Sequence, residues 1–231
     1  MECLKTITSH TCSIAYTPDE RLLQDDMSTT IPTTRRAFRR TDDHTPGAPK
    51  FKLVREDLAL PLAATQVLIK VHAVALNYRD ANIANGGNPW PVIPHGIPCN
   101  DASGEVVDKG DQVRFLQIGD RVAPIIDTEN LTGQESTRSW LAADEDGVLA
   151  DYIIFDERTL CKLPEYLDWV QASILPCAGV TAWTALKDFG IGKSVLIQGM
   201  SPTSPSDAFT NIARYRWREH VRPEARSCGR A

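Results

Sequence analysis

The sequence predicts a mainly β fold that continues into an α/β segment: a partly open β-barrel, then connecting helices and one buried strand. Short β-branched segments, separated by Gly, Pro and Asp turns, fill residues 51–163, as is typical of a small barrel. After Pro164 the apolar period becomes helical. The run SVLIQG at residues 194–199 is apolar without alternation, which is typical of a strand buried on both faces.

The barrel strands are expected in chain order at residues 51–54, 66–74, 104–107, 121–124, 149–155 and 160–163. A short helix is expected at 77–85, stopping at Gly86. Residues 125–146 are expected to form a polar loop. Further along, Asp168 is positioned to cap a turn, and Pro176 to open a helix that ends at Gly190. A barrel, a helix and a buried strand in this order predict that the chain continues into the first part of an α/β nucleotide-binding domain.

Residues 1–49 resemble a polar leader, because Thr, Ser and Pro dominate them, and we expect disorder or a loose strand there. Arginine pairs at 35–36 and 39–40 suggest a mitochondrial leader, but four aspartates in the same segment argue against it. Residues 1–26 are expected to be a dispensable extension. The start of the chain lacks a secretory apolar region, and no apolar run reaches 18 residues, so a cytoplasmic protein without a membrane partner is expected.

Charge and cysteine usage exclude some classes of partner and site. Residues 50–199 hold 20 acidic and 13 basic side chains, which disfavours nucleic acid as a partner. All six cations of residues 200–231 are arginines, so this tail is either a nucleic-acid arm or a product of an altered reading frame or unspliced intron. The six cysteines have no short spacing and are expected to be reduced thiols, not a zinc knot.

Five blocks in order resemble the medium-chain dehydrogenase/reductase superfamily, close to zinc-type alcohol dehydrogenase-like and quinone oxidoreductase proteins: residues 76–80 (LNYRD), 104–107 (GEVV), 119–122 (GDRV), 175–183 (LPCAGVTAW) and 195–199 (VLIQG). The resemblance implies a GroES-like barrel at 50–165, connecting helices and the first Rossmann strand at 166–199, and an unrelated tail at 200–231. It also implies hydride transfer with NADP(H) to a small carbonyl, quinone or enone, and a possible homodimer.

Zinc-dependent members of this family have Cys, His and Cys at the positions of Asn77, Asn100 and Cys177. Only the last of these matches, and neutral amides bind zinc poorly. Residues 124–160 contain no cysteine, although a structural zinc needs four thiolates there. We therefore expect neither a catalytic nor a structural zinc ion in this protein. Cys177 is most simply a small buried apolar residue, because no histidine forms an evident partner motif with it.

In zinc-free relatives an Asn and a Tyr face the nicotinamide, which by resemblance assigns catalysis to Asn77 and Tyr78, with Asp80 fixing the helix. Asn77 also fits a plain N-cap, with Tyr78 in the core. Thr181 resembles a nicotinamide contact, but its hydroxyl also fits a bond to a carbonyl one turn earlier. Trp90 is expected to serve packing or to line a substrate mouth.

The family pattern ends at Gly199, which begins the expected phosphate-binding turn. Residues 200–206 (MSPTSPS) then replace the glycines whose backbone N–H groups would hold the pyrophosphate. The Rossmann domain is therefore expected to be incomplete in this chain, with weak NADP(H) binding and little activity. The alternative function is a non-catalytic GroES-like remnant or interaction module.

Overall fold

The computed structural model describes residues 31–186. Contacts divide these residues into a unit that ends at Pro176 and a segment that begins at Cys177, and each is described by itself. The expected helix end at Gly190 and the expected strand at residues 194–199 lie outside the described residues. Among residues 31–186, no helix combines the length and hydropathy that crossing a membrane requires.

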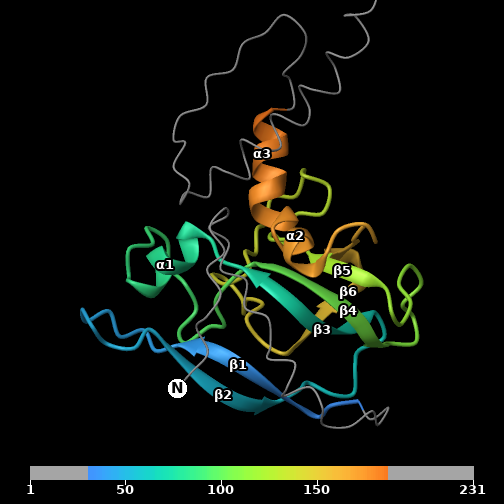
Figure 1. Ribbon diagram of the computed structural model, residues 1–231, viewed down its shortest axis with the longest axis horizontal. Coiled ribbons are helices and arrows are strands. Elements are labelled where there is room, and N and C mark those ends of the chain that lie inside the picture. The colour runs from blue at the N-terminus through green and yellow to red at the C-terminus, as the bar shows by residue number, and fades with distance from the viewer. Residues whose placement is uncertain (1–30, 187–231) are drawn as a thin grey trace, which may run out of the picture. The chain divides into compact units, whose positions relative to one another are not determined.

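The first unit is built on an antiparallel five-stranded sheet with the strand order β6-β3-β4-β5-β7 (Figure 1). Each strand falls on a segment that the sequence predicted, although β4 is longer and β6 begins later than expected. The strands are β3 (Gln66–Ala75), β4 (Asp101–Lys109), β5 (Arg121–Pro124), β6 (Tyr152–Asp156) and β7 (Leu160–Lys162). As expected, residues 125–146 form no strand; they contain only isolated bridges, such as the one between Asp127 and Trp140.

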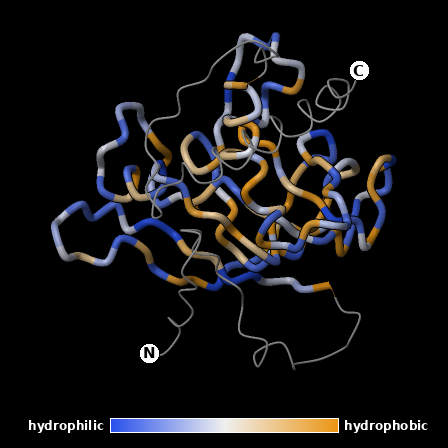
Figure 2. The backbone as a smooth tube through the Cα atoms, turned by 45° about the horizontal axis from the view of Figure 1, so that its top comes forward, coloured by the Kyte–Doolittle hydropathy of each residue, from blue (hydrophilic) through white to orange (hydrophobic). Residues whose placement is uncertain are grey.

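The sheet curls because β3 and β4 do not pair in a single register. The pairing shifts between Leu68 and Ile69 and again between Val71 and Ala73, and such bulges bend and twist a strand. Apolar side chains on the concave side form one buried cluster that includes Val67, Ile69, Val106, Val122 and Val148. Figure 2 shows long hydrophobic stretches in the central strands of this unit. The result is the partly open, mainly β barrel that the sequence predicted.

A separate two-stranded ribbon packs beside this sheet, and its first strand corrects the expectation of a disordered leader up to residue 49. β1 (Thr34–Arg40) pairs with β2 (Phe51–Asp57), with Arg35 opposite Glu56. Phe38 N donates to Leu149 O at 3.0 Å, and Asp151 N donates to Arg36 O at 2.9 Å. Of the two alternatives for this segment, the strand is therefore correct for residues 34–40, because backbone partners far along the chain fix it.

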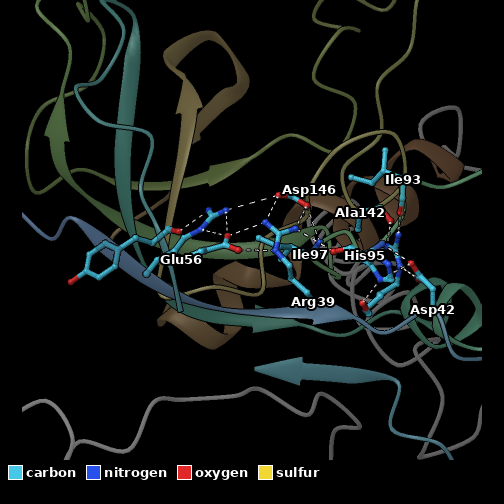
Figure 3. A network of polar contacts seen from close by, with 11 residues as sticks. Arg39, Asp42, Glu56, Ile93, His95, Ile97, Ala142 and Asp146 are labelled. Atoms are coloured by element: carbon cyan, nitrogen blue, oxygen red, sulfur yellow. Dashed lines mark hydrogen bonds and ion pairs between the residues drawn. The ribbon is translucent and has the colours of Figure 1, made fainter. Parts of the chain in front are cut away.

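The arginine pairs of β1 take part in structural contacts. Arg39 donates to both Glu56 and Asp146, as Figure 3 shows, with its Nε 2.7 Å from Glu56 Oε2 and its Nη1 3.1 Å from Asp146 Oδ1. Arg35 donates to the same glutamate at 2.9 and 2.7 Å. These bonds, chiefly the one from Arg39, hold the pKa of Glu56 below its usual value. Arg36 instead pairs with Asp151. The arginine-rich composition thus belongs to a folded ribbon.

Short helices complete the described chain: α1 (Tyr78–Ala84), α2 (Trp169–Ser173) and α3 (Val180–Ala185). The Asp168 carboxylate accepts from Gln171 N at 2.7 Å, which confirms the expected cap. Pro176 does not open the following helix. It lies inside a π-helical turn at Leu175–Gly179, and a proline, which has no N–H, interrupts the regular α-helical bonding.

The side chain of Trp169 anchors α2 to the sheet. Its ring stacks on His72 of β3 at 4.3 Å and 10°, and the Arg121 guanidinium of β5 lies 4.0 Å from its centroid. Ser103 Oγ donates to Trp169 O at 2.6 Å. Burial lowers the pKa of His72, which favours the neutral ring beside Arg121. One tryptophan thus connects α2 to three strands of the sheet.

Candidate functional site

Three polar side chains from two segments meet where α1 begins. Asn77 Nδ2 donates to Asn100 Oδ1 at 3.2 Å and to Asp101 Oδ2 at 2.8 Å. Asn100 is 1% exposed and Asp101 is fully buried. The antiparallel pairing of β3 with β4 sets Ala75 opposite Asp101 and so brings the ends of both strands together. We call Asn77, Asn100 and Asp101 the amide cluster.

The third residue of α1, Asp80, fixes the start of this helix. Asp80 Oδ2 accepts from Asn77 N at 2.7 Å, which satisfies a donor that would otherwise be unpaired at a helix N-terminus. Asp80 is 6% exposed, and burial raises the pKa of its carboxyl. Asp80 therefore fixes the local helix, as the sequence analysis expects, and Asn77 occupies the N-cap position while its amide nitrogen bonds elsewhere. The N-cap interpretation of Asn77 is therefore correct, and its role toward a nicotinamide stays a prediction.

The orientation of the Asn77 amide follows from its neighbours. A carboxylate only accepts hydrogen bonds, so the atom that faces Asp101 must be the amide nitrogen. Both N–H groups of Asn77 are then used, one toward Asn100 and one toward Asp101. Its carbonyl oxygen faces the backbone N–H of Asp80 in the capping box of α1, and of its two lone pairs one remains as an acceptor. Asp101 was not among the residues predicted for the site, and its only sequence signal is its place directly after Asn100.

Tyr78 lies next to the amide cluster but does not belong to the core. Its side chain is 77% exposed, so the alternative that places it in the core is wrong. A phenol at the first position of α1 extends into solvent because the helix buries Ile83 and Ala84 on its other side. Its hydroxyl is therefore accessible as a hydrogen-bond donor.

The remaining predicted site residues lie in other parts of the chain. Thr181 is exposed on α3, and Cys177 is partly exposed in the π-helical turn, not fully buried as expected. Both belong to the segment that begins at residue 177, whereas Asn77 and Asn100 belong to the unit before it. Gly199 lies outside the described residues. Among residues 31–186, the cysteines at 99, 161 and 177 form no disulfide.

Comparison with known proteins places this geometry in a family. Residues 63–165 match the alcohol dehydrogenase GroES-like domain. A zinc-type alcohol dehydrogenase-like protein of Schizosaccharomyces pombe is 31% identical over 170 residues, which are 70% of this chain and 49% of that protein. Human quinone oxidoreductase is 31% identical over 160 residues, covering 67% of this chain and 43% of that protein.

A solved structure from Sinorhizobium meliloti 1021, described as an alcohol dehydrogenase, superposes with a TM-score of 0.60 at 27% identity. The match covers 69% of this chain and 47% of that one. The chain belongs to the medium-chain dehydrogenase/reductase superfamily. It spans about half the length of the curated relatives it matches.

The resemblance implies that Asn77 and Asn100 stand where zinc-dependent members of the superfamily have two zinc ligands. The structure brings these two side chains together, but as an amide hydrogen bond. An amide nitrogen has no lone pair to give to a metal, and the facing Asn100 oxygen already accepts a hydrogen bond. This donor set does not fit zinc. Among residues 31–186, no three His, Cys, Asp or Glu side chains are grouped so that they could hold a metal ion.

Proposed function

We propose that this chain carries the barrel part of a zinc-independent, NADP(H)-dependent oxidoreductase that reduces a carbonyl, quinone or enone. The names of its relatives support this class. One is a human quinone oxidoreductase, and another, from Arabidopsis thaliana, is an NADPH-dependent alkenal/one oxidoreductase that is 33% identical over 158 residues. That match covers 65% of this chain and 38% of the Arabidopsis protein.

The observation that carries the proposal is the fixed amide of Asn77. Asn100 and Asp101 hold both N–H groups of Asn77, and its oxygen, which takes part in the capping box of α1, keeps one acceptor position. We assign that position to the carboxamide of a nicotinamide. NADPH, when bound, supplies the hydride. The exposed hydroxyl of Tyr78 then serves as the donor that stabilises negative charge developing on the substrate oxygen. Thr181 is assigned to the nicotinamide by resemblance alone.

Zinc analysis of the purified chain tests the metal-free part of the proposal. We expect well under one zinc per chain by inductively coupled plasma mass spectrometry, because two of three ligand positions are amides engaged with each other. The matched control is Cys177→Ala, which should leave the zinc content unchanged. One zinc per chain that disappears in Cys177→Ala would refute zinc independence.

A second candidate is a non-catalytic GroES-like module, which the sequence after Gly199 favours. No glycine occurs between Gly199 and Gly229, and Pro202 and Pro205 cannot donate to a phosphate. We therefore expect no micromolar NADPH binding when the full chain is titrated by calorimetry. Micromolar binding would show that residues 200–231 build a phosphate site of another kind, and would exclude the non-catalytic candidate in its simple form.

A graft separates the two candidates. Residues 200–231 are replaced by the part of the NADPH-dependent Arabidopsis relative that follows the matched region. If the barrel is catalytic, this chimaera should bind NADPH and reduce an enone, and Tyr78→Phe should lower its kcat by about 100- to 1,000-fold, as loss of a positioned donor does. Asn77→Ala should weaken NADPH binding. A chimaera that binds NADPH but reduces no carbonyl, quinone or enone would contradict the proposal and favour the non-catalytic module.

A further inference from the structure

One strand of the described chain has a free edge. β2 pairs with β1 on one side, and in Figure 1 it lies on the side of β1 that faces away from β3. Among residues 31–186, no strand pairs with its other side. The outer strands of the five-stranded sheet are less accessible, because β7 has only three residues and Arg35 Nη1 donates to Tyr152 O of β6 at 3.2 Å. We call the free side of β2 the outer edge of the ribbon.

Backbone bonds at both ends of the ribbon show which groups point to the outer edge. Thr41 N donates to Lys50 O at 3.0 Å. At the other end, Leu58 N donates to Thr33 O at 2.8 Å. Since bonding alternates along an antiparallel strand, the even-numbered residues of β2 bond to β1. The residues whose N–H and C=O groups point outward are Phe51, Leu53, Arg55 and Asp57. Within residues 31–186 these outward groups have no hydrogen-bond partner, and such a row is a template for another strand.

A second copy of β2 satisfies this edge completely. Antiparallel pairing about a two-fold axis at Val54 sets Phe51 opposite Asp57, and Leu53 opposite Arg55, of the other copy. Every outward N–H and C=O then bonds across the axis. A register shifted by two residues in either direction leaves outward groups at the strand ends without a partner, so the axis at Val54 is preferred.

The charges along β2 fit the same register. Directly opposite positions carry no like charges, since Lys52 faces Glu56 of the other copy and Arg55 faces its leucine. A shift of two residues toward the C-terminal end would instead set Arg55 against Arg55, and like charges directly opposite are destabilising. Glu56 already accepts from two arginines of β1, so the charges select the register and the backbone bonds supply the attraction.

Apolar side chains lie beside the outward groups. Phe51 is 37% exposed and Leu53 is 57% exposed, and both project from the same face of β2 as Arg55. In the paired strands, Leu53 of each copy lies diagonally across from that of the other, a separation that long side chains bridge. The stem of Arg55 then covers Leu53 of the facing copy. Pairing therefore removes apolar surface from water in addition to forming backbone bonds.

We propose that β2 is the interface of a homodimer of this chain, in which the two copies of β2 pair antiparallel about a two-fold axis at Val54. The two ribbons then form one sheet with the strand order β1-β2-β2-β1. A strand of unrelated sequence would match this order of charges only by coincidence, whereas a second copy matches it by symmetry. This inference stands apart from the proposed function, since it needs neither NADP(H) nor the amide cluster.

Sedimentation velocity of the full chain tests the dimer. A small edge-to-edge interface is weak, and we expect monomer and dimer to exchange over roughly 1–100 μM. Leu53→Pro removes an outward N–H and leaves the residues that bond to β1 in place, and proline is tolerated on an edge strand. It should raise the dimer dissociation constant at least about tenfold, because a carbonyl of the other copy loses its donor at the centre of the interface.

Leu53→Ala is the matched control, because it shortens the same side chain but keeps the N–H group. It should raise the dissociation constant less than Leu53→Pro does. A chain that stays monomeric over the whole concentration range, or a dimer that both variants weaken equally, would overturn the proposal. Circular dichroism shows whether Leu53→Pro has folded, and cross-linking decides if it has not.

Cysteine cross-linking tests the register. On the axis, Val54 faces Val54 of the other copy in a non-hydrogen-bonded pair, with Cα atoms about 4.5 Å apart, a distance that a disulfide spans. The two copies of Lys52 stand about 14 Å apart along the strands, which is too far for a disulfide. Under mild oxidation, Val54→Cys should therefore give at least about tenfold more disulfide-linked dimer than Lys52→Cys, which also controls for the natural cysteines. Equal yields would overturn the pairing of β2 with a second copy.

Discussion

Replacement of Arg40 by methionine is expected to lower the free energy of unfolding by about 3–5 kcal/mol, the usual cost of removing one partner from a buried charged network. Arg40 is 1% exposed. Its guanidinium donates to Asp42 Oδ1 at 3.2 Å, to Ala142 O at 3.2 Å and also to Ile93 O, contacts that Figure 3 shows around Asp42, Ile93 and Ala142. Methionine fills much of the volume but leaves these acceptors without their donor.

Arg55→Met is the control for the Arg40 experiment. Arg55 is exposed on β2 of the same ribbon, where its side chain donates to Thr34 Oγ1 at 3.3 Å. Exposed substitutions of this kind change stability by no more than about 0.5 kcal/mol. Urea unfolding, followed by circular dichroism, measures both variants. If Arg40→Met lost no more stability than Arg55→Met, the buried network would contribute nothing to the fold.

Gly147→Ala is expected to cost at least about 3 kcal/mol, toward the upper end of what overpacking costs. A Cβ at this position would lie 2.1 Å from Cys99 O and 2.5 Å from Pro98 O, atoms of a backbone that cannot rotate away. Gly147 N donates to Ile97 O at 2.8 Å, so the two segments must approach closely. The segment that would be displaced leads directly into Asn100 and Asp101, and the amide cluster should be disturbed as well.

Gly133→Ala separates the effect of crowding from that of backbone strain. Gly133 has a φ of +84°, and nothing lies within 4 Å of a Cβ built there. Alanine should therefore cost only the left-handed backbone strain, about 1–2 kcal/mol. Unfolding in urea again provides the measurement. A Gly147→Ala variant as stable as Gly133→Ala would mean that residues 97–99 move away without cost, and that the close approach is not required.

The strands of the barrel could be predicted because their signal is local. Residues 66–74 alternate and are β-branched, and the structure places β3 at Gln66–Ala75. β1 lacked such a signal, since its seven residues include four arginines. Three of those arginines fit a strand because Glu56, Asp146 and Asp151 face them from other segments, and the fourth, Arg40, is held by Asp42 and by backbone carbonyls. A partner far along the chain, not the strand's own composition, makes that segment regular.

The sequence by itself determined the family, the positions of the barrel strands along the chain and the amides at positions 77 and 100. Sequence blocks, local strand patterns and residue types can all be identified without a structure. Only the tertiary structure decided what those amides do. The pairing of β3 with β4 brings Asp101 to Asn77, and a carboxylate that can only accept then turns the amide so that its nitrogen faces Asp101 and its oxygen faces the start of α1. Likewise, Trp90 and Trp140 meet at 6.1 Å although 50 positions separate them in the chain. Contacts between distant segments depend on how the chain folds back on itself, which local patterns do not specify.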